Sequence, residues 1–251
     1  MEQVEVRFLL KSGGFYVETG EKIMKKIGII CAGDEELEPF LPHIEDVVIR
    51  EKAMLKFYEG QIDTVPIVAL YSGVCKVNAA IATQLLIDTY DIHSIINAGT
   101  AGGMDECVEL FDTVISTQTA YHDVDDEILT EFHPWMSSVY FNADETLLAV
   151  AQTIRKENRI HFGRMVTGEK FIEDNMRNII NKKYAPLSVD METASIAHVC
   201  HVNKIPFIAI RSITDTATHI GIQNFEKNCK QASVIAKDVT LSFLNQLKLH
   251  L

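Results

Sequence analysis

The strongest constraint on the fold is a series of short apolar runs that alternate with longer amphipathic stretches. Apolar runs bounded by small residues are typical of strands buried on both faces, and the stretches between them have helical spacing. We expect strands at 27–30, 65–71, 94–98, 114–121, 164–167, 187–190 and 206–215, and helices at 77–90, 147–156, 192–203 and 225–249. This alternation predicts an α/β fold, a three-layer sandwich with a central, mostly parallel twisted sheet flanked by helices.

The chain is predicted to form one domain that follows an N-terminal extension. Its 251 residues are 47% hydrophobic, enough for one substantial core, and no repeat or low-complexity linker divides them. The extension, residues 1–23, has an apolar stretch too short for a membrane helix and preceded by acids, unlike a signal peptide. We expect either a disordered tail or translation that starts at Met24, since the codons of Gly20 and Glu21 can supply a ribosome-binding site. The single domain would then cover residues 24–251.

Composition disfavours several classes of function. A net charge of −12 repels the phosphates of nucleic acids and anionic lipid heads, so we expect neither nucleic acid nor membrane as a partner. The five cysteines are odd in number and include no CxxC pair, which favours reduced thiols in a cytoplasmic protein. Cys200 has His198 and His201 nearby, but this segment has the pattern of an amphipathic helix, so no metal site is expected.

Acidic residues follow several of the predicted strands, where an open α/β sheet collects its ligands. Asp215 ends the last apolar strand, Glu192 stands at a helix start, and the acidic run 34–36 follows the first strand. Each also has a plainer explanation, as a turn, a helix N-terminus or a solvated run. Because all lie at the same edge of the sheet, we expect them to converge on one cleft, where partial burial would raise the pKa of Asp215.

A glycine-rich segment, 97–103, lies at the end of the predicted strand 94–98. We expect this strand to stop at Gly99. Small residues there would let a ligand lie against backbone N–H groups. The segment is neither a P-loop nor a GxGxxG fingerprint, because no Lys-Ser/Thr pair follows and the spacing differs. By itself it fits a tight turn as well as a binding site.

Several segments together resemble the 5′-methylthioadenosine/S-adenosylhomocysteine nucleosidases of the nucleoside phosphorylase superfamily. The matching segments are 27–36, 72–74, 97–103, 166–172, 189–197 and 211–215. The resemblance extends from Met24 to the C-terminus and implies a nucleoside phosphorylase-like fold without a cofactor. It also implies hydrolysis of the N-glycosidic bond of an adenine nucleoside, which releases adenine and the 5-thioribose.

The resemblance implies a role for each site residue. Asp215 would protonate the purine at N7, Glu36 would activate a water molecule, and Glu192 would hold the ribose hydroxyls. A purine departs more easily when it is protonated, and an electron-poor sugar is stabilised by a nearby carboxylate. The other implied residues are Arg211 and Thr100, which order the site, Met191 on the sugar, Phe171 stacked on the adenine, Ile172 at the adenine edge, Ala101, Gly102 and Thr214 around the substrate, and Val74 and Phe225 along the 5′ group. Without the resemblance, Phe171 would be assigned to the core.

Four positions depart from the pattern usual in that family. Gly33 replaces an apolar methionine that contacts the 5′ substituent, so the sequence leaves the preferred 5′ group open. Asp190 stands where glutamate is common and Cys75 where glycine is common. Thr100 replaces a serine and keeps its hydroxyl.

Three alternatives remain open from the sequence. A phosphorylase would use phosphate, but the acidic run 34–36 repels phosphate and the segment 72–78 has no arginine. A non-catalytic nucleoside-binding or storage protein should have lost one of Glu36, Glu192 and Asp215, and all three are present. The third alternative keeps the chemistry and changes the substrate to 5′-deoxyadenosine or an adenine-bearing futalosine derivative.

The resemblance also implies a homodimer in which the partner subunit closes the 5′ end of the pocket. The aromatic segment 132–135 is a candidate interface loop, because aromatic side chains are enriched in interfaces. Packing of this loop on its own subunit explains it equally well.

Overall fold

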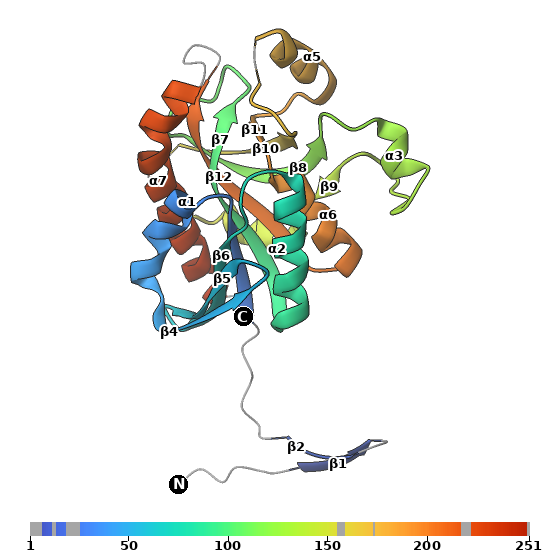
Figure 1. The fold of residues 1–251 in the computed structure, drawn as a ribbon, viewed down its shortest axis with the longest axis vertical. Helices are drawn as coiled ribbons and strands as arrows, with labels where there is room; N and C mark the ends of the chain where they lie inside the picture. The colour runs from blue at the N-terminus through green and yellow to red at the C-terminus, as the bar shows by residue number, and fades with distance from the viewer. Residues whose placement is uncertain are drawn as a thin grey trace.

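The computed structural model describes residues 7–11, 14–18, 26–154, 159–172, 174–216 and 222–249 (Figure 1). Inside the predicted extension, Arg7–Lys11 (β1) and Gly14–Glu18 (β2) pair as a separate antiparallel hairpin. Met24, the predicted start of the domain, lies outside the described residues, so the boundary at that position stays a prediction.

The remaining described strands form one ten-stranded sheet, and each strand and helix expected from the sequence is present. The strands are β3 (Lys26–Cys31), β4 (Glu45–Lys52), β5 (Leu55–Ile62), β6 (Val65–Tyr71), β7 (Ile92–Gly103), β8 (Thr113–Tyr121), β9 (Phe141–Asn142), β10 (Ile160–Thr167), β11 (Ser188–Asp190) and β12 (Phe207–Asp215). The helices are α1 (Asp34–Leu37), the 3₁₀ helix η1 (Glu38–His43), α2 (Lys76–Thr89), α3 (Asp126–Thr130), α4 (Glu145–Ala151), α5 (Asp174–Tyr184), α6 (Thr193–Asn203) and α7 (Ile222–Lys248).

The predicted α/β sheet is confirmed, and it is mixed rather than purely parallel. Its order is β11-β10-β8-β12-β7-β3-β6-β5-β4, with β9 beside β8. The strands β6, β3, β7 and β12 are parallel, but β4, β5 and β6 form an antiparallel meander and β8 runs antiparallel to β12. Because β11 pairs with both β10 and β7, the strands β7, β12, β8, β10 and β11 close on one another.

The glycine-rich segment belongs to a strand, contrary to the prediction that the strand stops at Gly99. β7 continues to Gly103 because it stays paired with β12, where Arg211 faces Gly99 and Ser212 faces Thr100. The glycines of β7 therefore remove side chains from this part of the strand, while its backbone pairing with β12 continues. The segment is a strand whose end borders the cavity described below.

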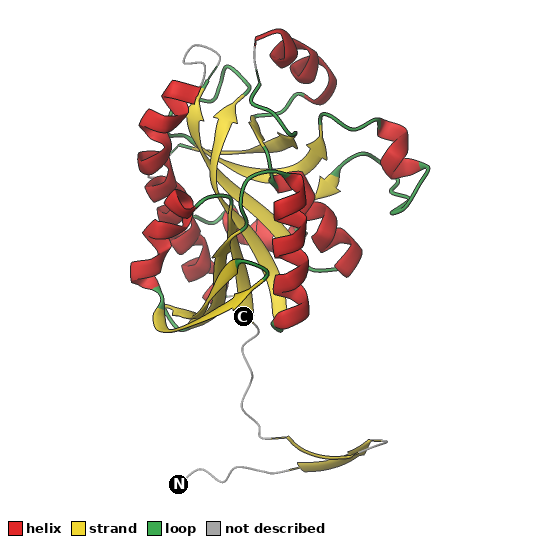
Figure 2. Ribbon diagram, viewed as in Figure 1, coloured by secondary structure: helices red, strands yellow, loops and turns green. Residues whose placement is uncertain are grey.

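Two apolar cores lie on opposite faces of the sheet and make the predicted three-layer sandwich. One face is covered by α2 and α6, and the other by α1, α4 and α7 (Figure 2). The alternating strands and helices therefore bury both faces of the sheet, as the apolar runs predict. In the described ranges no helix is long and apolar enough to span a bilayer.

The hairpin β4–β5 is an element that the sequence pattern does not reveal. Every residue of β4 is exposed, including Val47, Val48 and Ile49, because β4 is an edge strand without a covering layer. Its mixture of charges and apolar residues therefore has neither a continuous apolar run nor a regular alternation.

Candidate active site

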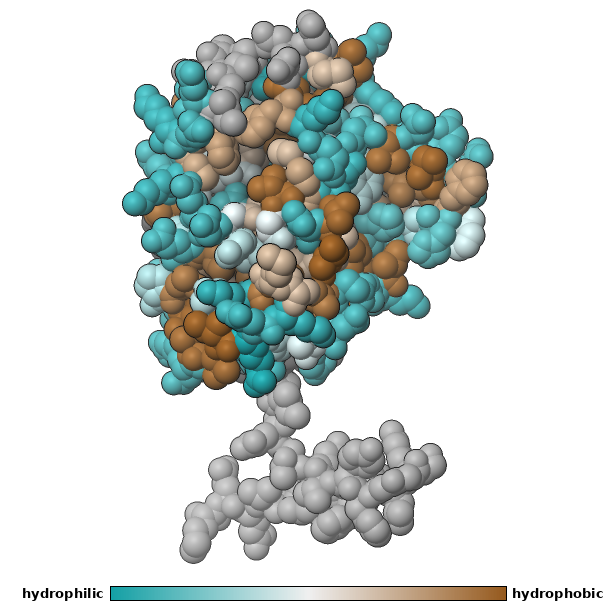
Figure 3. All heavy atoms as spheres, in the orientation of Figure 1, coloured by the Kyte–Doolittle hydropathy of each residue, from teal (hydrophilic) through white to brown (hydrophobic). Residues whose placement is uncertain are grey.

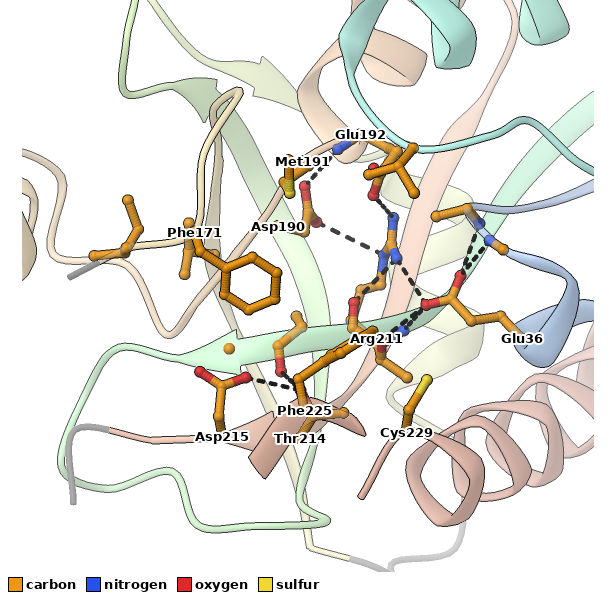
Figure 4. A pocket seen from close by; sticks show the side chains of 18 of the residues that line it. Glu36, Phe171, Asp190, Met191, Glu192, Arg211, Thr214, Asp215, Phe225 and Cys229 are labelled. Carbon is orange, nitrogen blue, oxygen red and sulfur yellow. Dashed lines mark hydrogen bonds and ion pairs between the residues drawn. The ribbon is translucent and has the colours of Figure 1, made fainter. Parts of the chain in front are cut away.

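A cavity of about 420 Å³ opens at the carboxyl ends of the central strands (Figure 4). Its walls come from the segment after β3, from β7, from the loop after β10, from the turn after β11, from the end of β12 and from α7. Every site residue expected from the sequence lines it, namely Glu36, Val74, Thr100, Ala101, Gly102, Phe171, Ile172, Met191, Glu192, Arg211, Thr214, Asp215 and Phe225. The structure therefore brings together residues that are separated by up to 189 positions in the chain, from 36 to 225.

Glu36 is buried at one end of the cavity and is held by backbone and side-chain donors. Its Oε2 accepts the N–H of Ala32 at 2.7 Å, and its Oε1 accepts the N–H and the hydroxyl of Thr100 at 2.7 and 2.8 Å. Helix α1, in which Glu36 lies, begins at Asp34 and directs the side chain back toward β7. A carboxylate fixed in this way has a defined direction toward the cavity.

Arg211 lies beside Glu36 and is 1% exposed. Its guanidinium is 3.4 Å from Glu192 Oε2 and 3.6 Å from both Glu36 Oε1 and Asp190 Oδ2. It also donates to the carbonyl of Thr100 at 3.0 Å. Figure 4 shows the guanidinium between the three carboxylates, of which Glu36 comes from α1, and Asp190 and Glu192 come from the end of β11 and the turn that follows it.

Glu192 projects from the turn that precedes α6. Its Oε1 accepts the backbone N–H of Cys75 at 2.8 Å. Burial raises the pKa of Glu192 to about 7, while Arg211 opposes the rise and the charges of Asp190 and Glu36 add to it. Glu192 therefore changes its charge close to neutral pH.

A buried polar network supports this cluster from behind. Asn97 Oδ1 accepts from Arg211 Nε at 3.1 Å and from the Thr193 hydroxyl at 2.7 Å, and Asn97 Nδ2 donates to the carbonyl of Ile30 at 2.9 Å. The Thr193 hydroxyl also contacts Asp190 Oδ2. The sequence analysis assigns Asn97 no role, although a polar residue inside an otherwise apolar strand is a usable signal.

Asp215 lies at the opposite end of the cavity, at the last residue of β12. Burial raises its pKa, as the sequence predicts, while a hydrogen bond from the Thr214 hydroxyl at 2.8 Å and the guanidinium of Arg177 lower it. Gly102 lets the carboxylate approach β7, because a Cβ there would lie 3.0 Å from Asp215 Oδ2. Arg177, which also lines the cavity, is not among the residues expected from the sequence.

Two aromatic rings cover the cavity near Asp215. Phe171 and Phe225 meet edge to face with their centroids 5.7 Å apart. Phe171 is 46% exposed, so it is not a core residue, and its ring lies between Met191 and Asp215 in Figure 4. An exposed ring above a cavity offers a flat apolar surface on which a planar base can stack.

The cavity has no cluster suited to a metal ion. In the part of the chain that the structure describes, no group of three or more His, Cys, Asp and Glu side chains could hold one. The arrangement is an acid beside an aromatic stacking surface at one end and a carboxylate–guanidinium cluster at the other.

Comparisons with known proteins agree with this fold. The model of the phosphorylase superfamily matches residues 26–245. A 5′-methylthioadenosine/S-adenosylhomocysteine nucleosidase of Exiguobacterium sp. is 34% identical over 234 residues, with 89% of this chain and 99% of the relative covered. The nucleosidase of the same name from Halalkalibacterium halodurans is 36% identical over 231 residues, covering 89% of this chain and 100% of the relative.

Solved structures give the same result. The nucleosidase of S. pneumoniae, determined with a transition-state inhibitor, aligns with a TM-score of 0.81 and 30% identity, covering 88% of this chain and 99% of that chain. The fold and its cavity thus define an α/β protein of the phosphorylase superfamily. Within that superfamily, the chain belongs to the 5′-methylthioadenosine/S-adenosylhomocysteine nucleosidase family.

Proposed function

We propose that this protein hydrolyses the N-glycosidic bond of 5′-methylthioadenosine, S-adenosylhomocysteine or a close relative, and releases adenine. The main support is the placement of a partly buried acid and of a carboxylate–guanidinium cluster at opposite ends of one cavity. Asp215, whose pKa is raised by burial, lies at the end with the aromatic rings, and the Glu36–Arg211–Glu192 cluster lies at the other end. A proton donor for the base and carboxylates for the sugar are the two requirements of this reaction.

At the base end, the purine stacks on Phe171 and receives a proton at N7 from Asp215. Stacking is permissive toward the base, so hydrogen bonds to the base edge choose adenine. The backbone of Ile172, next to Phe171 on the cavity wall, is placed to supply them. Protonation converts the departing base into a neutral molecule, which lowers the barrier to bond cleavage.

At the sugar end, the ribose acquires positive charge as the bond breaks. Glu192 binds the ribose hydroxyls as a carboxylate and stabilises that charge, with Met191 packed against the sugar. Glu36, oriented by Ala32 and Thr100, takes a proton from the water that attacks C1′. Thr100 and Arg211 hold Glu36 in place for that step.

The charges of the cavity favour water over phosphate as the nucleophile. Asp34, Glu35 and Glu36 line the cavity, and their carboxylates repel an anion. A phosphorylase, the alternative on this fold, would need cationic groups or N–H groups for phosphate. Arg211 does not supply such a group, because it is already surrounded by three carboxylates.

The cavity has open space next to Gly33, at the end that we assign to the 5′ group. A Cβ on Gly33 would meet no atom within 4 Å, and Val74 and Phe225 supply the apolar walls. We propose that this space accepts substituents larger than a methylthio group. The homocysteine arm of S-adenosylhomocysteine is one such substituent.

A homodimer is part of the proposal, and one face of the subunit supports it. Val77 and Ile81 on α2 are 69% and 48% exposed, and Phe132 and Trp135 beside α3 are 59% and 68% exposed. Apolar side chains gather over both helices in Figure 3. Apolar clusters of this kind mark protein interfaces.

The five cysteines are free thiols, which supports a reducing, cytoplasmic compartment.

The test is adenine release from 5′-methylthioadenosine in phosphate-free buffer, and then with phosphate added. Release without phosphate, with free 5-methylthioribose as the second product, is the expected result. Release that requires phosphate would make the protein a phosphorylase. If neither condition gives release, 5′-deoxyadenosine, S-adenosylhomocysteine and an adenine-bearing futalosine derivative are tested in the same way, and failure with all of them would favour a binding protein.

A further inference from the structure

Arg211 is surrounded by more negative charge than it can neutralise. Its buried guanidinium lies 3.4 to 3.6 Å from oxygens of Glu36, Asp190 and Glu192, and all three acids are themselves buried. One cation cannot balance three anions in a site of low polarity, so simultaneous ionisation of the three acids is unfavourable. At least one of them must therefore respond to the charge of the others.

Both carboxylate oxygens of Asp190 are in contact with polar groups of the protein. Its Oδ1 accepts the hydroxyl of Thr167 at 2.7 Å and the N–H groups of Glu192 and Thr193 at 3.1 and 2.9 Å. Its Oδ2 faces the Thr193 hydroxyl and Arg211 Nε. These contacts occupy both oxygens, so Asp190 has little capacity left for a substrate although it lies at the cavity wall.

Glu192 has fewer contacts within the protein than Asp190 and keeps a free direction toward the cavity. Its protein contacts are the N–H of Cys75 and the guanidinium of Arg211. The ionisable groups that face it are Arg211 from β12, Asp190 from β11, Glu36 from α1 and the Cys75 thiol before α2. Burial raises the pKa of Glu192 to about 7, and the charge of Asp190 contributes more to the rise than that of Glu36.

We propose that Asp190 is a positioning residue that aims Glu192 and controls its charge. The first link is geometric, because Asp190 fixes the N–H groups of residues 192 and 193 and thereby the turn from which Glu192 projects. The second link is electrostatic and acts across Arg211. This inference rests on the proposed function, in which Glu192 binds the ribose hydroxyls as a carboxylate. Below neutral pH Glu192 carries a proton, and binding of the sugar releases it.

The direct test follows the charge of Glu192 without any turnover. Protein labelled with ¹³C at the glutamate carboxyl is titrated by NMR, and the Glu192 signal is assigned from its loss in Glu192→Gln. In Asp190→Asn, which keeps the shape of the side chain, the midpoint of Glu192 is expected to fall by roughly one pH unit. An unchanged midpoint would overturn the proposal. Should Asp190→Asn fail to fold, Asp190→Ser removes the same charge and keeps an acceptor for the two N–H groups.

A matched variant separates charge from structure. Thr167→Val removes the hydroxyl that binds Asp190 Oδ1 and Ala194 N but leaves every charge in place. It is expected to lower the melting temperature and to leave the midpoint of Glu192 where it is. Equal midpoint shifts in Thr167→Val and Asp190→Asn would show that Asp190 has only a structural role, which would contradict the proposal.

The pH profile of turnover gives the second readout. In Asp190→Asn the acidic limb of kcat/KM should move to lower pH by the same interval as the NMR midpoint. If the protein hydrolyses no nucleoside at any pH, the proposed function fails, while the NMR titration still decides whether Asp190 controls Glu192. If the NMR midpoint moves and the acidic limb does not, Glu192 is not the group that limits turnover, and the proposed role of Asp190 in the reaction is wrong.

Discussion

The carboxylate of Glu36 lies against the backbone of Gly99. A Cβ at position 99 would be 2.5 Å from the carboxyl carbon of Glu36 and 2.5 to 2.6 Å from its two oxygens. Real Cβ atoms do not approach other atoms so closely, and the carboxylate cannot move away without losing its bonds to Ala32 and Thr100. The absence of a side chain on this strand residue is therefore what gives Glu36 its position.

The change Gly99→Ala is expected to displace Glu36 and to abolish most of the activity. A misplaced catalytic group costs about 100-fold or more in kcat/KM, and overpacking in a buried strand costs about 1–3 kcal/mol of stability. The measurements are adenine release and thermal unfolding. Gly33→Ala is the stability control, since a Cβ there meets no atom within 4 Å. Full activity in Gly99→Ala would show that the reaction does not depend on the position of Glu36.

The change Asp215→Asn should remove the proton donor and keep the shape of the base end. We expect kcat to fall by roughly 10²–10⁴-fold. Binding of adenine or of a substrate analogue, measured by calorimetry, should stay within about tenfold, because Phe171 and Ile172 are unchanged. Turnover that survives this substitution would exclude Asp215 as the acid.

Much of the fold follows from the sequence because buried strands leave a clear pattern. The strands β3, β6 and β7 have to be apolar on both faces, so each one contains a continuous apolar run that the sequence displays directly. The edge strand β4 has no covering layer, so its composition reports neither burial nor register. The antiparallel pairing of β8 with β12 leaves no such signal, since strand direction depends on long-range topology rather than on local sequence.

The site is partly predictable for a related reason. Acids at the carboxyl ends of neighbouring strands must meet at one edge, which is why Glu36, Glu192 and Asp215 can be grouped from the sequence. The network behind them cannot, because the contacts of Asn97 with Arg211 and Thr193 depend on the register of β7 against β12 and on the turn before α6. No spacing in the sequence encodes that register.

The change Gly33→Met should narrow the choice of 5′ substituent. The methionine side chain can enter the open space next to Val74 and Phe225 and would fill part of the 5′ end. One extra or missing methylene in a pocket alters discrimination by about 10–200-fold. We expect the ratio of kcat/KM for 5′-methylthioadenosine over S-adenosylhomocysteine to rise by roughly tenfold, at the lower end of that range. An unchanged ratio would mean that the 5′ group lies elsewhere.

The change Cys75→Gly is expected to stabilise the protein. Cys75 has φ 80° and ψ 164°, a backbone conformation that glycine adopts readily and other residues only under strain. Relief of about 1–3 kcal/mol of strain exceeds the extra entropy that glycine loses on folding, about 0.5–1 kcal/mol. The melting temperature should rise by about 2–4 °C, while the N–H bond to Glu192 is kept. Cys75→Ala retains the strain and should show no such gain, so equal gains in both variants would contradict this explanation.

The change Glu192→Gln should stabilise the protein at alkaline pH while it stops turnover. Burial raises the folded-state pKa of Glu192 from its ordinary value of 4.5 to about 7, so the folded state binds a proton that the unfolded state has lost. The stability that comes from this proton is complete below pH 4.5 and disappears as the pH rises through about 7. Glutamine cannot ionise, and Arg211 keeps Asp190 and Glu36 as partners, so the variant avoids this loss.

Thermal unfolding of Glu192→Gln and of the unmodified protein from about pH 5 to pH 8.5 tests this expectation. The difference in melting temperature should be small at about pH 5, grow up to about pH 7.5, and reach roughly 4–8 °C, equivalent to about 2 kcal/mol. Glu51→Gln, a change at an exposed side chain on β4, is the control and should show no pH-dependent difference. If the difference in melting temperature shrinks as the pH rises, Glu192 is stabilised as an anion in the folded protein. The cluster around Arg211 would then carry no excess of negative charge.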